Sequence, residues 1–273
     1  MHIQPPSDTM LALTSEWTGE RFDDGRPRVS DDVLEELRTA TTEAIWTVLW
    51  DEGYEHQFEG GWLITHPAKR LVGRAVTAQF LPRRPDLDTI MVTTANDEGR
   101  PTRSENQNWL VVESLVEGDV MVVDIFGKIY EGTVIGDQLG TAIDSRTKAG
   151  AVIHGGIRDL EGISQLSNIN VYYRGTDPTP IRNVTLAGLN IPVRIGGATA
   201  MPGDVVLGTP SGVLFIPPHL AERAARLSAE TKRRDHFAKT RLSEGVYSTS
   251  QIDVEIWAEE IESDYTSWQS AVR

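Results

Sequence analysis

The pattern of hydrophobic and polar positions predicts a helix close to the start of the chain. Ser30 is a good N-cap residue, because its side chain can accept a hydrogen bond from a free backbone N–H of the first turn. Apolar residues then recur at helical spacing from Val33 to Leu49, and Gly53 marks a stop. Residues 1–29 are rich in Pro, Asp, Gly and Ser and show no periodicity, which predicts an irregular N-terminal arm.

From residue 71 onward, short apolar runs alternate with turn residues. Residues 83–108 are polar and predict a loop that could include a short helix, whereas Asp137–Gly150 and Pro218–Gly245 have helical patterns. The predicted strands are 72–80, 120–124, 151–153, 171–173, 193–195, 205–207 and 212–217. Helices interleaved with strands indicate an α/β domain with a mixed or layered sheet.

The composition limits the classes of function. A formal net charge of −14 over 273 residues disfavours nucleic acid and anionic membrane surfaces as partners. The absence of cysteine excludes disulfides, thiolate nucleophiles and iron–sulfur clusters. No apolar run approaches the roughly 20 residues that span a bilayer, and the N-terminus lacks the pattern of a secretory signal. We therefore expect a soluble, cytoplasmic protein.

Two short segments have the residue types of a binding site for an anion. Gly136–Gly140 places Asp137 just before a predicted helix, where the backbone N–H groups of the first turn have no intrahelical partner and can hold an anion. Gly155 and Gly156 precede Arg158 and Asp159 at the end of a predicted strand, where a guanidinium and a carboxylate would be accessible to a ligand. The alternative for the second segment is an ordinary salt-bridged turn.

The spacing of these segments is similar to that of a known family. Twenty residues separate Asp137 from Arg158. The chain resembles the RraA-like family over roughly residues 30–245, and within it the class II pyruvate aldolases that cleave 4-hydroxy-4-methyl-2-oxoglutarate. The resemblance rests on several ordered motifs: Gly73–Thr77, Gly118–Asp124, Gly136–Asp137, Gly155–Asp159, Pro192–Val193, Gly196–Gly197, Pro202–Val206, and Arg241–Leu242 with Gly245.

The resemblance implies a metal-dependent carbon–carbon lyase that acts on a small 2-oxo acid. It implies that Asp159 binds a divalent cation directly and that Asp137 does so through water. Few carboxylates and several waters suit Mg²⁺ or Mn²⁺. Arg158 would bind the pyruvyl group and stabilise its enolate, and the backbone N–H groups of Gln138 and Leu139 are candidates for the substrate carboxylate. The expected reaction is retro-aldol cleavage of a 4-hydroxy-2-oxo acid to pyruvate and a second carbonyl compound.

Further residues are candidates of a second rank. His154 stands where the family often has an acidic residue, so it could act as an acid or base, or it could be a structural histidine. Arg182, with Arg174 as its rival, has about the right separation for a second substrate-binding cation, or it could be a surface charge. The sequence alone does not exclude a Schiff-base lysine at Lys128 or Lys148, although the resemblance argues against one.

The resemblance also implies a fold and an assembly. The fold would be a layered β/β/α domain like the swivelling phosphohistidine domain, with an N-terminal helical arm and a C-terminal helix, assembled as a homotrimer or homohexamer. Residues 246–273 form a tail with Trp257 and Trp268, which predicts docking on the chain's own domain or on a neighbouring subunit. Two alternative functions remain: an oxaloacetate decarboxylase with the same site, and a non-catalytic protein-binding regulator.

Overall fold

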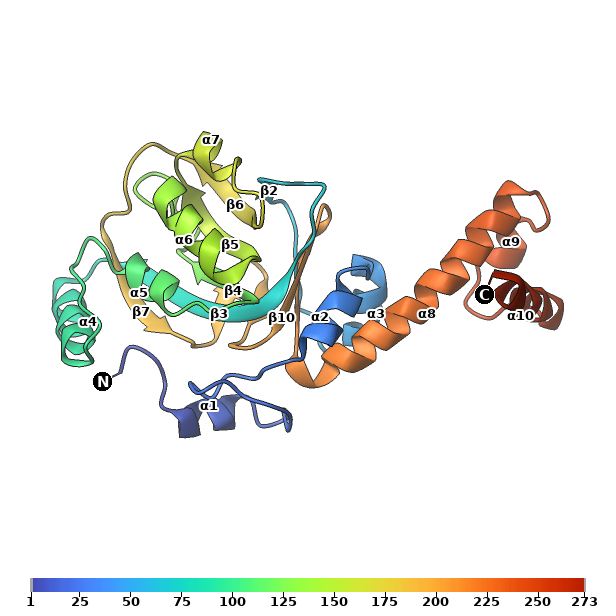
Figure 1. The fold of residues 1–273 in the computed structure, drawn as a ribbon, viewed down its shortest axis with the longest axis horizontal. Helices are drawn as coiled ribbons and strands as arrows, with labels where there is room; N and C mark the ends of the chain where they lie inside the picture. Colours follow the sequence, from blue (N-terminus) through green and yellow to red (C-terminus); the bar gives the residue numbers. More distant parts are fainter. Residues whose placement is uncertain (1, 273) are drawn as a thin grey trace.

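Four parallel strands form the centre of a nine-stranded mixed sheet (Figure 1). The computed structural model describes residues 2–272. The parallel strands are β3 (Leu71–Pro82), β4 (Asp119–Asp124), β5 (Gly150–Ile157) and β6 (Asn170–Thr176). Their residues are mostly buried and rich in Val and Ile, as expected for parallel strands that are covered on both faces. Each of these strands contains a run of residues that the sequence predicted as a strand.

Antiparallel strands extend the sheet on both sides. Strands β10 (Val205–Thr209), β11 (Gly212–Ile216) and β1 (Phe58–Glu59) follow β3 on one side, and β2 (Leu63–Ile64) pairs with β6 on the other. Strand β7 (Val184–Leu189) pairs with the end of β3 beyond a bulge. Strands β8 (Val193–Ile195) and β9 (Ala198–Ala200) form a separate hairpin. The sheet is therefore mixed, as predicted, although the apolar pattern did not predict β1, β2, β7 or β9.

Alternate residues of the central strands supply two hydrophobic cores. Met121 and Val123 point to one face, where helices α5 (Asn108–Glu113), α6 (Asp137–Thr147) and α7 (Leu160–Ile163) lie in front of the sheet in Figure 1. Val120 and Val122 point to the opposite face, where the core includes residues of the β8–β9 hairpin. This alternation fixes which side chains of β5 can reach the helices.

Helix α4 (Pro85–Asp97) lies within residues 83–108, where the sequence predicted a loop that could include a short helix, and its 13 residues fill the first half of that segment. Pro85 occupies the first turn, where its fixed φ suits a helix, and Met91 and Ala95 are buried in the core. Most polar residues of this helix face solvent and one buried position is the polar Asp88, so the apolar stripe is too narrow to stand out in the sequence.

The helix predicted from Ser30 to about Gly53 is two helices, α2 (Asp31–Leu37) and α3 (Thr42–Asp51). Ser30 caps α2 as predicted, by accepting a hydrogen bond from the Val33 amide. Thr41 caps α3 in the same way, by accepting one from the Ala44 amide at 3.2 Å. A second N-cap inside a continuous apolar pattern divides the helix, because the cap residue has extended dihedral angles. Both helices pack against α8 (Pro218–Ser243).

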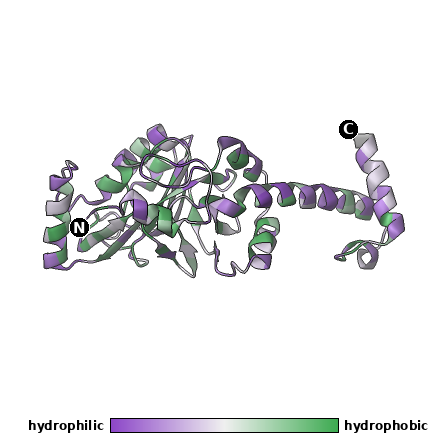
Figure 2. Ribbon diagram, turned by 90° about the horizontal axis from the view of Figure 1, so that it is seen from below, coloured by the Kyte–Doolittle hydropathy of each residue, from purple (hydrophilic) through white to green (hydrophobic). Residues whose placement is uncertain are grey.

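Helix α8 continues well beyond the sheet and carries the C-terminal tail at its far end (Figures 1 and 2). The tail contains α9 (Thr249–Ile252) and α10 (Glu259–Val272). Phe237 of α8 packs against Trp257 and Tyr265 with ring centroids 5.4 and 5.3 Å apart. The aromatic rings thus dock the tail on the outer half of the chain's own α8.

The N-terminal arm is more regular than its sequence predicted. It contains a short helix, α1 (Ser7–Leu13), and its last part is tied to the sheet by the buried Arg26. The Arg26 guanidinium donates two hydrogen bonds to Asp119, at 3.0 and 3.2 Å, and one to Asp24 at 2.7 Å. Burial opposes its charge, but these carboxylates outweigh that effect and raise the pKa of Arg26. No helix among the described residues is long and apolar enough to span a membrane.

The Arg26–Asp119 pair leads to a prediction about stability. Replacing Arg26 with Ala would leave the fully buried carboxylate of Asp119 without its partner, which should lower the free energy of unfolding by roughly 3–5 kcal/mol. Denaturation in urea measures this change. Arg38→Ala, which removes an exposed pair with Glu35, is the matched control and should cost at most about 1 kcal/mol. Equal losses in the two variants would contradict the anchoring role of Arg26.

Asp204 makes stability depend on pH. Its side chain lies in the turn between β9 and β10, accepts a hydrogen bond from the Met201 amide at 2.8 Å, and has a pKa raised by burial to about 7. The unfolded carboxyl has a pKa of about 4. The folded protein therefore retains a proton that the unfolded chain releases between these values. The contribution to stability is complete at acidic pH and is lost as the pH rises toward neutrality.

We expect Asp204→Asn, which keeps the acceptor for Met201, to remove this pH dependence. Unfolding free energies of both proteins, measured from mildly acidic to neutral pH, should converge at the acidic end. At neutral pH the variant should be the more stable protein. Parallel profiles for the two proteins would show that the Asp204 carboxyl does not titrate in this range.

Candidate functional site

A short parallel pairing brings together the two segments that the sequence singled out. Thr133 forms a bridge with Gly156, and the Val134 amide donates to the Gly156 carbonyl at 3.0 Å. One step further along, the Arg158 amide donates to the Ile135 carbonyl, also at 3.0 Å. The chain leaves this pairing into α6 and returns to it along β5. This path accounts for the twenty residues between Asp137 and Arg158.

The N-terminus of α6 holds the first candidate segment. Gly136 is the N-cap and Asp137 is the first helical residue, in agreement with the predicted helix start. The Asp137 Oδ1 atom accepts a hydrogen bond from the Gln138 amide at 2.8 Å. The first turn therefore combines a carboxylate with backbone N–H groups, and these favour negative charge nearby.

Arg158 and Asp159 form the second segment, immediately after β5. The Arg158 Nε atom lies 3.5 Å from Asp159 Oδ2, and the two side chains are 43% and 44% exposed. Asp159 has a left-handed backbone with φ of +52° and is the N-cap position of α7. A non-glycine residue in this conformation is uncommon and strained, and such residues concentrate at functional sites.

Two glycines let these groups approach each other. A Cβ atom added to Gly136 would overlap Asp159 Oδ2 and lie 3.0 Å from Arg158 Nε. A Cβ atom added to Gly162 in α7 would lie 2.8 Å from the Cβ atom of Asp137. The carboxylates of Asp137 and Asp159 therefore both lie at the junction of α6 and α7, and the Arg158 side chain lies next to Asp159.

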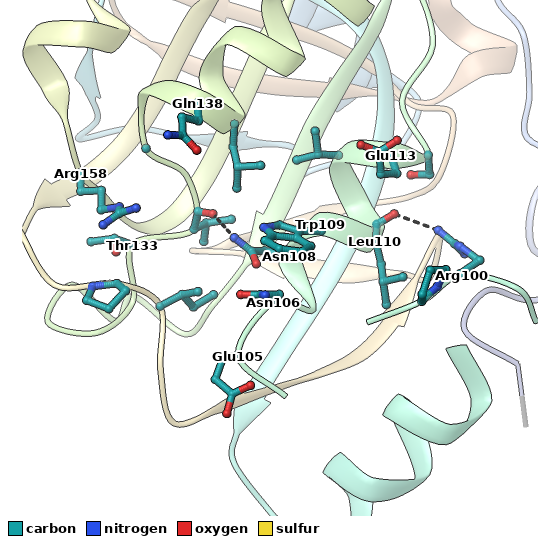
Figure 3. A pocket seen from close by; sticks show the side chains of 18 of the residues that line it. Arg100, Glu105, Asn106, Asn108, Trp109, Leu110, Glu113, Thr133, Gln138 and Arg158 are labelled. Atoms are coloured by element: carbon teal, nitrogen blue, oxygen red, sulfur yellow. Dashed lines mark hydrogen bonds between the residues drawn. The ribbon is translucent and has the colours of Figure 1, made fainter. Parts of the chain in front are cut away.

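A cleft of about 1050 Å³ opens beside this junction (Figure 3). Asp137, Gln138, Leu139 and Arg158 are among its lining residues, whereas Asp159 packs against Gly136 and is not one of them. The sequence predicted residues for catalysis, for substrate binding and for metal binding. These five are the ones among them that the fold brings together.

The opposite wall of the cleft consists of residues that the sequence did not single out. Asn108 and Trp109, at the start of α5, lie between Arg158 and the rest of the cleft in Figure 3. The Asn108 Nδ2 atom donates to the Val134 carbonyl at 2.7 Å, which fixes the amide against the parallel pairing. Asn108 is the last residue of the polar stretch that predicted a loop and Trp109 follows it, and no spacing or motif distinguishes them there.

Asp88 of α4 holds this wall in place. Its buried carboxylate accepts hydrogen bonds from Ser104 at 2.6 Å and from the Gln107 side chain at 2.7 Å. Burial raises the pKa of Asp88, but the hydrogen bonds from Ser104, Gln107 and Arg83 outweigh it and keep that pKa below its ordinary value. The loop that leads into Asn108 is therefore attached to the charged form of a core carboxylate.

The structure does not bring His154 into the cleft. It alternates with Ile153 along β5, so its side chain points away from α6, to the face that carries Trp62 and Tyr172. The His154 Nδ1 atom lies 3.1 Å from Asp124 Oδ1, and the side chain is 16% exposed. The sheet separates it from Arg158, so within one chain the predicted acid–base role lacks a route to the substrate.

The second-rank cations also lie elsewhere. Arg182 is exposed and outside the cleft lining, although its neighbours at positions 180 and 181 belong to it. Arg174 forms an ion pair with Glu59 and lies over the ring of Trp62 at 3.8 Å from its centroid. Lys128 donates to the Arg182 carbonyl at 2.6 Å. These contacts occupy Arg174 and Lys128 in structural roles.

The donor set suits a cation that keeps most of its water. Within residues 2–272 there is no group of three or more His, Asp or Glu side chains arranged to hold a metal ion. The junction offers two carboxylates, from Asp137 and Asp159. Asp159 packs closely against Gly136, and Asp137 packs closely against Gly162. Two carboxylates with water are a donor set that Mg²⁺ accepts, whereas a zinc site would need more protein ligands.

These features define a mixed α/β protein with an arginine and two carboxylates beside a cleft at a helix N-terminus. The family model described as RraA-like (Aldolase/RraA) matches residues 29–215. The chain belongs to the RraA-like family, which confirms the resemblance inferred from the motifs.

Individual relatives share only 27–31% sequence identity with parts of this chain. A protein of Halalkalibacterium halodurans, provisionally named a 4-hydroxy-4-methyl-2-oxoglutarate aldolase, is 27% identical over 146 residues, which cover 52% of this chain and 69% of that protein. A protein of Ectopseudomonas mendocina with the same provisional name is 31% identical over 105 residues, which cover 38% of this chain and 64% of that protein. Protein DlpA of Legionella pneumophila is 28% identical over 191 residues, which cover 68% of this chain but only 28% of DlpA.

Solved structures share the fold. An uncharacterised protein of Pseudomonas syringae pv. tomato superposes with a TM-score of 0.67 at 22% identity, covering 87% of this chain and 99% of that one. Streptomyces coelicolor RraAS2, described as an unusual member of the RNase ES inhibitor RraA protein family, gives 0.66 at 23% identity, covering 79% of this chain and 99% of that one. At these identities the likeness establishes the fold alone.

The packing at Gly136 can be tested directly. Its backbone, with φ of −120°, accommodates alanine, and the atoms that a new Cβ would meet belong to partly exposed side chains. We therefore expect Gly136→Ala to change the free energy of unfolding by no more than about 1 kcal/mol while it separates Arg158 from Asp159. A crystal structure of the variant checks the displacement. Gly197→Ala, where the added atom has ordinary clearance, is the control and should leave both side chains unmoved.

Proposed function

We propose that this chain is a divalent-metal-dependent carbon–carbon lyase that cleaves a 4-hydroxy-2-oxo acid to pyruvate and a second carbonyl compound. The observation that carries the proposal is the junction of α6 and α7, where Arg158 lies beside Asp159 and lines the same cleft as Asp137. The provisional names of two relatives support the same reaction class.

The chemistry requires that negative charge be stabilised on one oxygen. In retro-aldol cleavage the 4-hydroxyl group loses its proton and becomes a carbonyl as the C3–C4 bond breaks. The electron pair of that bond forms the C2–C3 double bond of the pyruvate enolate, whose oxygen carries the charge until C3 is protonated. A fixed guanidinium at this oxygen lowers the barrier, and Arg158 is the cation in the cleft beside the α6 N-terminus.

The other residues of the junction bind and orient the substrate in this proposal. The N–H groups at the start of α6, at Gln138 and Leu139, favour the substrate carboxylate, which would replace Asp137 Oδ1 as the acceptor of the Gln138 N–H. Asp137 is the carboxylate that the same turn presents to the cleft, and it is our candidate to accept the hydroxyl proton, directly or through water. Asp159 would hold the cation with help from Asp137, and a bound Mg²⁺ or Mn²⁺ would supply further positive charge for the enolate oxygen.

Oxaloacetate decarboxylation is the second reaction that this geometry supports. Loss of the C4 carboxylate as CO₂ leaves the same pyruvate enolate, so the same guanidinium would stabilise it. The two reactions differ in the group that leaves C3. In both of them the negative charge develops on the oxygen attached to C2. Substrates of both kinds therefore belong in the same assay.

The finer description of the fold belongs to the proposal as well. Helices on one face of the central sheet and a strand hairpin on the other support the layered, swivelling-domain type. Assembly as a homotrimer or homohexamer is proposed on the family resemblance. Exposed Trp46 and Trp50, whose ring centroids are 4.9 Å apart on α3, are compatible with a subunit contact there.

Arg158 provides the first functional test. Arg158→Ala should lower kcat/KM for pyruvate release by on the order of 10²–10³, because the charge on the enolate oxygen would lose its fixed donor. The measurement is pyruvate formation from a panel of 4-hydroxy-2-oxo acids and oxaloacetate. Arg223→Ala, which removes an ion pair between α8 and Glu52, is the control and should retain the wild-type rate. A fully active Arg158→Ala protein would rule out the assigned site.

Removal of the divalent cation provides the second functional test. Chelation should abolish pyruvate release, and added Mg²⁺ or Mn²⁺ should restore it. Asp159→Ala should be inactive at any concentration of the cation that restores the wild-type protein, because its direct ligand is missing. Asp137→Ala should regain part of its rate when the cation concentration is raised, because its contribution is indirect. Activity that survives exhaustive chelation would exclude the metal-dependent mechanism.

A further inference from the structure

The cleft, at about 1050 Å³, is far larger than a pyruvyl group requires, and its remaining part leaves room for the rest of the substrate. Figure 3 places Thr133 and Gln138 next to Arg158, followed by Asn108 and Trp109. The residues beyond the pyruvyl end are therefore the ones that would contact the group attached at C4.

Acidic and neutral side chains dominate this outer part. Glu105 and Glu113 both line it, and because Glu113 is paired with Arg146, Glu105 is the carboxylate without an ion-pair partner among the described residues. Within the described residues of the lining, the cationic side chains are Arg158 and Arg100. Arg100 donates to the Leu110 carbonyl at 2.8 Å and lies at the far end of the cleft from Arg158 in Figure 3. A second carboxylate on the substrate would thus meet glutamate before it met a free guanidinium.

Asn108 also disfavours a carboxylate on the substrate, in this case through hydrogen bonding. Its Nδ2 atom already donates to the Val134 carbonyl, which assigns the remaining polar atom as the acceptor Oδ1. That atom is buried and has no hydrogen-bond partner within the described residues. An acceptor requires a donor, which a hydroxyl group can provide and an ionised carboxylate cannot.

Trp109 provides the apolar surface of this part of the cleft. Its ring lines the cleft beside Asn108 and is 48% exposed, although a large aromatic side chain is ordinarily covered. A ring that is open to the cleft can pack against the carbon skeleton of a ligand whose hydroxyl groups point to Asn108 and Glu105.

From these observations we infer that the outer cleft selects substrates whose group beyond C4 is uncharged and hydroxylated, with Glu105, Asn108 and Trp109 as the residues that determine specificity. The inference rests on the proposed function and refines it, because it names the substrate class. The second product would be a hydroxyaldehyde and not a 2-oxo acid.

Two probes of equal length test this choice. 4,5-Dihydroxy-2-oxopentanoate would give pyruvate and glycolaldehyde, and 4-hydroxy-2-oxoglutarate would give pyruvate and glyoxylate. With the full chain and Mg²⁺, we expect kcat/KM to favour the hydroxymethyl probe by about tenfold or more. Exchange of the pyruvate methyl protons with deuterium, followed by NMR, reports enolate formation without any group beyond C3.

Variants of the outer wall should change the preference. Glu105→Lys would replace an anion with a cation, and we expect it to shift the ratio of kcat/KM toward the carboxylate probe by about tenfold, with Glu105→Gln giving a smaller shift in the same direction. Trp109→Ala should raise KM for the hydroxymethyl probe. Asp97→Lys makes the same charge change on the exposed end of α4, outside the cleft lining, and should leave the ratio unmoved.

The outcomes separate this inference from the proposed function. Deuterium exchange with a preference for the carboxylate probe, or without cleavage of the hydroxymethyl probe, would overturn the specificity and leave the enolate chemistry standing. Equal shifts in Glu105→Lys and Asp97→Lys would also overturn it, because the effect would then be a general one of net charge. Absence of both exchange and cleavage would refute the proposed function and, with it, this inference.

Discussion

The hydrogen bond from the Arg158 amide to the Ile135 carbonyl holds the candidate site together. It is the last link of a short parallel pairing between residues 133–135 and residues 156–158. Both segments leave the sheet at this point, one into α6 and the other into α7. Their side chains therefore have a fixed relation to one another, although α6 and β5 separate them in the sequence. Precise placement of this kind is what electrostatic catalysis requires.

Charge is distributed unevenly around this point. The chain is strongly acidic overall, and Arg158 places a guanidinium beside the α6 N-terminus, at the opposite end of the cleft from Arg100. An anionic group that enters the cleft is therefore attracted to the end that holds Arg158. The same contrast connects the binding of a pyruvyl group to the selection of the group attached beyond it.

Much of the remaining structure supports the walls of the cleft from a distance. The buried carboxylate of Asp88 fixes the loop that leads to Asn108, and the buried pair of Arg26 with Asp119 fixes the N-terminal arm to the start of β4. Both depend on charged groups inside the protein, which are stable only while their partners remain. The aromatic contacts of α8 with the tail are of a different kind, since they are apolar and lie away from the sheet.

Local patterns and ordered motifs were enough to predict the strands of the central sheet, the cap at Ser30, the start of α6 and the family. The same motifs identified Asp137, Arg158 and Asp159 as candidates. The pattern could not divide α2 from α3, since a cap at Thr41 competes with a continuous apolar stripe. Nor could it find Asn108 and Trp109 or separate His154 from Arg158. Those outcomes depend on which face of a strand a side chain occupies and on which loops meet in space, and these are properties of the folded chain and not of any local segment.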